Sequence, residues 1–328
     1  MDDDPALRPE REATVGSAGG RRRRGEQPMV PPAGFRSYYG LPVLNEPTWH
    51  DHDIAGYLFL GGLAGASSIL AAAADLTGRP RLARAGKAGA LCAVGGSLYA
   101  LIHDLGRPSR FVNMLRVFKV TSPMSVGTWI LSAYGPQAGL AAATAVTGLF
   151  PRLGRAASAG AGLTGAAVAT YTAALISDTA VPLWHGGHRE MPLLFAGSAM
   201  SAAGGLGMFA APVAEAGPAR NAALLGTAVE VAAAKAMERR LGPVVAEPLR
   251  QGKGRLARLG EGLSVAGALL GATAGRRSRA AAVVAGAALL AGSACTRFGI
   301  FHAGVASAGD PRYTVEPQRA RLSAERRA

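Results

Sequence analysis

Four long stretches without a charged residue constrain this chain more than any other feature. They are residues 54–74, 120–151, 156–177 and 191–214, and they hold 21, 32, 22 and 24 residues. A helix needs about 20 consecutive apolar residues to cross the hydrocarbon core of a bilayer. Each stretch is long enough for one crossing, so we expect an integral membrane protein.

Four weaker apolar runs cover residues 88–102, 221–229 with its continuation, 262–275 and 280–296. Each could be a buried helix of a soluble protein, but neighbouring helices in a multi-pass chain lower the hydrophobicity that a crossing requires. We therefore expect an all-α integral membrane protein with eight transmembrane helices in two four-helix bundles. The expected helices are residues 53–75, 87–105, 124–150, 156–177, 191–213, 218–238, 257–275 and 279–301.

The distribution of charge and the cysteine count exclude other classes. Of the 35 Lys and Arg residues, 12 lie in residues 1–36 and 309–328, which disfavours an ordinary nucleic-acid-binding domain despite the net charge of +14. Cys92 and Cys295 are too few for a disulfide scaffold or a cysteine-ligated cluster. The expected parts are a disordered charged tail over 1–36, a transmembrane domain over 37–305 and a basic C-terminal tail over 306–328.

The eight helices would place both chain ends and three long connections on one side of the membrane, here called the terminal face. Trp49 and Trp184 fall on this side. So do all six histidines, which are His50, His52, His103, His185, His188 and His302. Aromatic belts account for tryptophans and normally form on both sides of a membrane. The histidines lie on one side only, which indicates a site or a docked partner on the terminal face.

The sequence Trp49-His50-Asp51-His52-Asp53 stands at the entrance to the first expected helix. Its histidines and carboxylates could ligate a metal ion, although one helical turn cannot aim all of them at the same ion. Asp53 could instead stabilise the positive end of the helix dipole. The third interpretation is a proton-relay or quinone site that uses His52 and Asp53. No metal centre is expected.

Residues 103–108, His-Asp-Leu-Gly-Arg-Pro, end the second expected helix. An ionisable side chain such as His103 at the end of an apolar run is usually functional. Asp104 and Arg107 are spaced for an ion pair, so a salt-bridged helix terminus is the alternative. An interfacial amphipathic helix is expected over 111–118, and serines near Pro123 are placed to cap the third helix.

Charged residues inside the expected helices are candidates for proton transfer. Glu230 lies in the sixth helix and Asp75 ends the first. Isolated carboxylates in membrane helices rarely serve packing. For Glu230, pairing with a neighbour is an equally good interpretation.

Several of these segments resemble one known family. Residues 57–66, 103–115, 121–129, 297–304 and 310–319 are similar to the NrfD/polysulfide reductase membrane subunit (PsrC-like) family, in the type associated with formate-dehydrogenase complexes. The resemblance covers about residues 38–320. The segments around His103-Asp104 and Thr121-Ser122-Pro123 together carry it.

The resemblance implies a quinone-reactive, multi-pass subunit of the bacterial inner membrane that holds no haem or iron–sulfur cluster. It implies a ferredoxin-like iron–sulfur partner, a molybdopterin catalytic subunit behind that partner, and menaquinone or ubiquinone as the bound quinone. The residues expected to bind the quinone are His52, Asp53, His103, Asp104, Arg107 and Ser125. Those expected to dock the partner are Arg110, Arg116, Lys119, Trp184, His185, Arg297 and His302. A transporter module and a passive anchor are the alternative functions.

Overall fold

The computed structural model describes residues 43–45, 47–107 and 109–325, so the tail expected over 1–36 lies outside the described residues. The described part has helices and no strand, and eight of its helices have 17 to 31 residues. These are α1 (Asp51–Leu76), α2 (Pro80–Asp104), α4 (Pro123–Thr147), α5 (Pro151–Ser177), α7 (Met191–Ala210), α8 (Gly217–Val245), α9 (Leu256–Ala272) and α10 (Arg279–Gly309).

Shorter helical segments connect or extend these eight. They are α3 (Ser109–Met114), α6 (Pro182–Gly186), α11 (Arg312–Glu325) and the 3-10 turns η2 (Glu247–Arg250), η3 (Gly252–Arg255) and η4 (Ala274–Arg276). The interfacial helix expected over 111–118 is shorter than predicted: α3 begins at Ser109 and ends at Met114. The segment expected as a basic C-terminal tail is helical in its described part, since α10 continues to Gly309 and α11 follows.

Proline and capping residues set several helix boundaries. Pro80, Pro123 and Pro151 each occupy the first position of a helix, where the missing N–H would have no partner in any case. The side chain of Ser122 caps α4 by accepting a hydrogen bond from the backbone N–H of Ser125 at 3.4 Å. The predicted serine cap is therefore confirmed. Pro151 also explains why α5 begins five residues before its expected start.

Small residues let the long helices approach closely. A methyl group built on Gly65 of α1 would lie 2.2 Å from the carbonyl oxygen of Gly165 in α5, and one built on Gly286 of α10 would lie 2.4 Å from that of Gly205 in α7. Such contacts are typical of membrane helices, where close packing replaces the hydrophobic effect. Helices α1, α2, α4 and α5 are neighbours of one another, as are α7, α8, α9 and α10, and α1 packs against α7 between the two groups.

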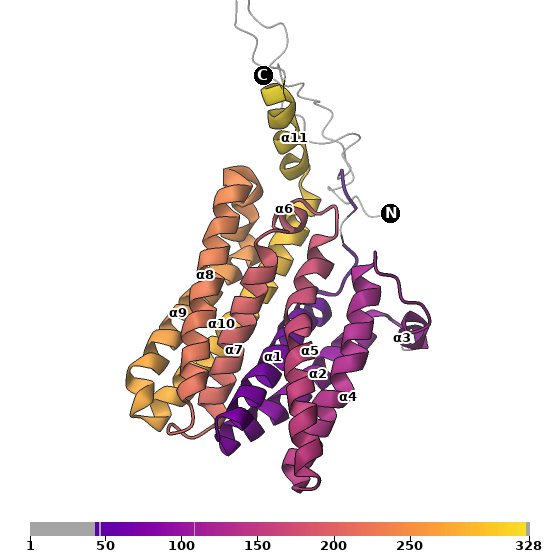
Figure 1. The fold of residues 1–328 in the computed structure, drawn as a ribbon. Helices are drawn as coiled ribbons and strands as arrows, with labels where there is room; N and C mark the ends of the chain where they lie inside the picture. The colour runs from indigo at the N-terminus through magenta and orange to yellow at the C-terminus, as the bar shows by residue number, and fades with distance from the viewer. Residues whose placement is uncertain (1–42, 46, 108, 326–328) are drawn as a thin grey trace, which may run out of the picture.

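Five helices of the described chain are long and apolar enough to cross a membrane: α1, α2, α5, α7 and α10. Helix α9 has 17 residues, and α8 carries Glu230 and Lys235 within its length. Figure 1 shows that the long helices run side by side. Helix α1 begins and α10 ends at the same end of this array, the upper end in Figure 1, where α6 and α11 also lie. This end corresponds to the terminal face.

Candidate functional site

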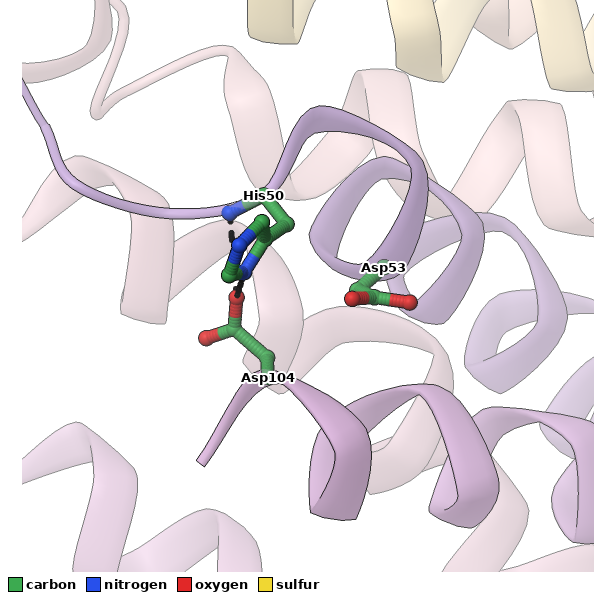
Figure 2. Close-up of side chains that lie close together, drawn as sticks. All are labelled: His50, Asp53 and Asp104. Carbon is green, nitrogen blue, oxygen red and sulfur yellow. Dashed lines mark hydrogen bonds and ion pairs between the residues drawn. The ribbon is translucent and has the colours of Figure 1, made fainter. Parts of the chain in front are cut away.

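Two histidine–carboxylate pairs join α1 to α2 at the terminal face. Nδ1 of His50 lies 3.2 Å from Oδ1 of Asp104, and the backbone N–H of His50 donates to the same oxygen at 3.0 Å. Nδ1 of His103 lies 2.7 Å from Oδ2 of Asp53. Figure 2 shows His50, Asp53 and Asp104 close together. Each helix thus contributes one carboxylate, which meets a histidine of the other segment.

The positions of these residues at the helix ends explain why each carboxylate pairs with a histidine of the other segment. Helix α1 begins at Asp51 and α2 ends at Asp104, so the start of one lies beside the end of the other. Asp53 lies in the first turn of α1, where the helix dipole favours a negative charge. Asp104 pairs with His50, whereas the sequence suggested Arg107 as its partner. The pairs thus connect residues about 50 positions apart, which spacing along one helix could not indicate.

The carboxylates and the imidazoles of these pairs differ in exposure. The side chains of Asp53 and Asp104 are 17% and 13% exposed, whereas those of His103 and His50 are 60% and 71% exposed. With Nδ1 facing a carboxylate, Nε2 of each ring is left for water or a ligand. Histidine is the side chain best suited to exchange protons near neutral pH. The pairs can therefore orient two imidazoles that exchange protons with the aqueous side.

A pocket of about 480 Å³ lies next to the pairs, between α1, α2, α3, α4 and α5. Most of its lining is apolar, and the polar groups are Asp104, Thr128, Tyr57 and Tyr171. The two tyrosine rings meet edge to face with centroids 6.4 Å apart. The hydroxyl of Tyr171 is buried and has no hydrogen-bond partner within the described chain. The full lining is Trp49, Ile54, Tyr57, Leu101, Asp104, Leu105, Met114, Met124, Thr128, Tyr171 and Leu175.

The pairs also bring three potential metal ligands together. One ligand atom each from His50, Asp53 and Asp104 lies within 4.8 Å of the others. Each carboxylate, however, already accepts a hydrogen bond from a histidine. The three side chains therefore have partners without an ion.

The residues predicted to bind the quinone occupy different places. Asp104 lines the pocket, and Asp53 and His103 form the neighbouring pair. His52 is exposed, and its Nδ1 bonds to Asp51. The hydroxyl of Ser125 donates to the carbonyl oxygen of Val117 at 3.0 Å and accepts from the backbone N–H of Lys119, so it holds the connection before α4.

Arg107 is exposed just after α2 and does not line the pocket. Sequence reasoning missed His50, Tyr57, Thr128 and Tyr171 as site residues. Tyr57 and Tyr171 are the one tyrosine of α1 and of α5. A single tyrosine in each of two apolar helices was the signal that could have indicated them.

The residues predicted to dock a partner divide into exposed and buried ones. Arg110, Arg116, Lys119 and His185 are exposed at the terminal face, and His302 is partly buried, with Nε2 3.8 Å from Oδ2 of Asp51. Trp184 and Arg297 are fully buried in the described structure, so neither is exposed to a partner there, and their docking role stays a prediction.

The two buried residues instead hold the helices together. The indole N–H of Trp184 donates to the carbonyl oxygen of Ile300 at 2.9 Å, and its ring stacks on Trp49 at 5.8 Å. The guanidinium of Arg297 donates to the carbonyl oxygen of Phe195 at 2.7 Å and lies 3.7 Å from the centre of the Phe195 ring. In the sequence, Arg297 lies near the expected end of the eighth helix, so its burial was not predicted.

The two carboxylates predicted to transfer protons lie far from these pairs. Asp75 ends α1 at the opposite end of the array and pairs with Lys87 of α2 at 2.8 Å. Glu230 of α8 is 2% exposed and accepts a hydrogen bond from the hydroxyl of Thr296 at 2.8 Å. The interpretation that Glu230 bonds to a neighbour is therefore confirmed. Proton transfer by Glu230 stays a prediction.

Comparison with known proteins identifies one family. The sequence model of the family described as polysulphide reductase, NrfD, matches residues 40–229, more than half of the chain. This range includes α1 to α7, both histidine–carboxylate pairs and the whole lining of the 480 Å³ pocket. No curated protein matches the chain.

Proposed function

Because the chain belongs to the NrfD, polysulphide reductase, family, we propose that it passes electrons between an iron–sulfur subunit and the quinone pool. Membership of this family makes it a membrane subunit of a quinone-interacting oxidoreductase. The finer proposal is an anchor with eight transmembrane helices in two four-helix bundles, inserted in a bacterial inner membrane. Helices α4, α8 and α9 would cross with the help of their neighbours.

The pocket between α1 and α5 is the observation that carries the proposal. Its apolar walls with a few convergent polar groups are typical of small-molecule sites. A quinone ring needs a hydrogen-bond donor at its carbonyl oxygen. The buried hydroxyl of Tyr171, which has no other partner in the described part, can provide one.

Protons would come from the histidine–carboxylate pairs. When a quinone binds, it accepts two electrons and two protons to become a quinol. His103 and His50 can each transfer a proton through Nε2 and recover it from water, because both imidazoles are exposed. Asp53 and Asp104 fix the orientation of the two rings through Nδ1.

The electrons would come from clusters in a partner, since the chain has two cysteines and each cluster requires several. A ferredoxin-like iron–sulfur subunit, with a molybdopterin subunit of the formate-dehydrogenase type behind it, fits this role. Four exposed cations follow α2 beside the pocket: Arg107, Arg110, Arg116 and Lys119. They would attract an acidic partner surface and bring its cluster near the quinone.

Proton transfer through the membrane is the remaining part of the proposal. Glu230 would carry a proton within the helix array, and Asp75 would exchange one at the opposite end. A proton or solute transporter is the alternative function, which the burial of Glu230 favours. Menaquinone and ubiquinone both suit the apolar pocket.

The decisive experiment separates quinone reduction from the chemistry of the partner subunits. The purified complex with His103→Ala or Tyr171→Phe is expected to lose most quinone-dependent turnover while its dye-linked activity stays normal. His188→Ala, which changes an exposed histidine that neither lines the pocket nor belongs to the two pairs, is the matched control and should behave as the wild type. Full quinone-dependent turnover in both variants would refute the proposed site.

A further inference from the structure

A second pocket, of about 440 Å³, lies among α7, α8, η2, α9 and α10. Leu194, Val231, Ala234 and Ile300 are among its apolar lining residues. Three carboxylates line it as well: Glu230, Glu238 and Glu261. This combination is unlike the pocket between α1 and α5, where Asp104 is the one carboxylate of the lining.

The carboxylates lie at different depths. Helix α8 runs toward the terminal face, so Glu238 lies about 12 Å nearer that face than Glu230, at 1.5 Å per residue. Glu261 lies in the second turn of α9, which begins at the terminal face. Glu238 pairs with Arg250 at 3.4 Å and Glu261 with Lys235 at 2.8 Å, and both pairs are partly exposed. The pocket thus has a charged mouth and ends at a buried carboxylate.

Only some of the polar atoms of Glu230 and Arg297 have hydrogen-bond partners in the described residues. Oε1 accepts from Thr296, whereas Oε2 has no hydrogen-bond partner in the described residues. Nε and Nη1 of Arg297, the next residue along α10, also have none there. No ion pair within 4.0 Å joins Glu230 to Arg297 in the described chain, although the two charges attract each other. Buried polar atoms without protein partners are usually satisfied by water.

Every helix that packs against Glu230 contributes a neighbour. Ser198 of α7 and Ser264 of α9 have hydroxyls near its carboxylate. Arg297 of α10 is the cation whose charge acts on it. Other charged groups stand toward the mouth: Lys235 and Glu238 of α8, and Arg258 and Glu261 of α9. The surroundings thus offer hydroxyls and one buried cation, which can hold Glu230 in either protonation state.

We propose that this pocket is a proton inlet that leads from the terminal face to Glu230. Glu261 and Glu238 receive protons from water at the mouth, and Glu230 binds the proton as a neutral carboxylic acid. Arg297 balances the charge of Glu230 after the proton leaves. This inference rests on the proposed role of Glu230 in proton transfer, and it adds the route and the side of entry. It does not depend on the quinone pocket.

Infrared spectroscopy of the purified complex tests the inlet without electron transfer. The wild type should show a carboxylic acid C=O band that shifts in D₂O and is absent from Glu230→Gln. Glu261→Gln should slow the deuterium exchange of this band several-fold, because it removes a proton acceptor at the mouth. Glu316→Gln, on the exposed face of α11, should leave the exchange rate unchanged.

A steric variant tests the route itself. Ala234 lines the pocket, whereas Ala232 on the same helix is exposed. Ala234→Phe should slow deuterium exchange at Glu230 several-fold, and Ala232→Phe, the matched control, should not. Equal exchange rates in Glu261→Gln, Ala234→Phe and the wild type would overturn the inlet. A C=O band unaffected by Glu230→Gln would overturn proton binding by Glu230. Quinone-dependent turnover is measured separately, so failure of the quinone site gives a different result.

Discussion

The two groups of helices handle charge in opposite ways. In the group formed by α1, α2, α4 and α5, the ionisable residues of the site lie at the terminal face, and each carboxylate has a histidine partner. In the group formed by α7 to α10, Glu230 and Arg297 lie inside the array, and some of their polar atoms have no partner among the described residues. The first group is therefore suited to proton exchange with water at its end, and the second to holding charged groups within the array.

The largest expected effect concerns the charge buried in the second group. Arg297→Leu should destabilise the protein by about 3–5 kcal/mol, because it removes a charge-assisted hydrogen bond to the carbonyl oxygen of Phe195 and a desolvated cation–π contact with the Phe195 ring. His103→Ala, which removes an exposed partner in the first group, should cost much less, about 1 kcal/mol or below. Thermal unfolding in detergent measures both.

The double variant Glu230→Gln with Arg297→Leu checks the cause. It should not recover the lost stability, because Glu230 is a neutral acid and leaves no uncompensated charge in Arg297→Leu. Equal losses in Arg297→Leu and His103→Ala would remove the distinction between the two groups.

The second prediction concerns a property that the groups share. Gly65→Ala in the α1–α5 contact and Gly205→Ala in the α7–α10 contact should each destabilise by about 1–3 kcal/mol through overpacking. Gly95→Ala on α2, where a methyl group has open space, is the matched control and should be neutral or stabilising. A loss for one helix contact alone would show that the groups differ in packing as well as in charge.

The third prediction concerns a contact that connects the groups. One carboxylate oxygen of Glu215, which precedes α8, accepts from the backbone N–H groups of Arg81 and Leu82 at 2.8 and 3.1 Å. It therefore caps α2 from the other group. Glu215→Ala should cost about 1 kcal/mol, measured as a lower midpoint of thermal unfolding. Faster amide exchange confined to the first turn of α2 would locate the effect, and unchanged exchange there would contradict the cap.

The smallest expected effect is a pH dependence at the terminal face. The hydrogen bond from Arg240 holds the pKa of Glu190 below its usual range. The pair therefore stabilises the fold above the ordinary glutamate pKa, and this contribution is lost as pH falls through the lowered pKa. Because the pair is partly exposed, the change should be at most about 1 kcal/mol. Arg240→Gln should flatten the acid side of the stability profile, and an unchanged profile would contradict this assignment.

The sequence predicted much of the fold because hydrophobic run length is a strong local signal. All eight expected long helices are present, and Pro123 and Ser122 mark the start of α4 as expected. The partners of charged residues were harder to predict. His50 and Asp104 are 54 positions apart, and no spacing rule within one helix pairs them. Arg297 looked like a cation near a helix end, but α10 continues for three further turns beyond it.

The most direct test of the account is photo-crosslinking with an azidoquinone. The native complex would be illuminated with this probe, and the labelled peptides identified by mass spectrometry. We expect labels on residues that line the pocket between α1 and α5, such as Tyr57, Met124 and Tyr171, and competition by unmodified quinone. Labels confined to the pocket of α7 to α10, or labels that unmodified quinone does not displace, would contradict the central claim.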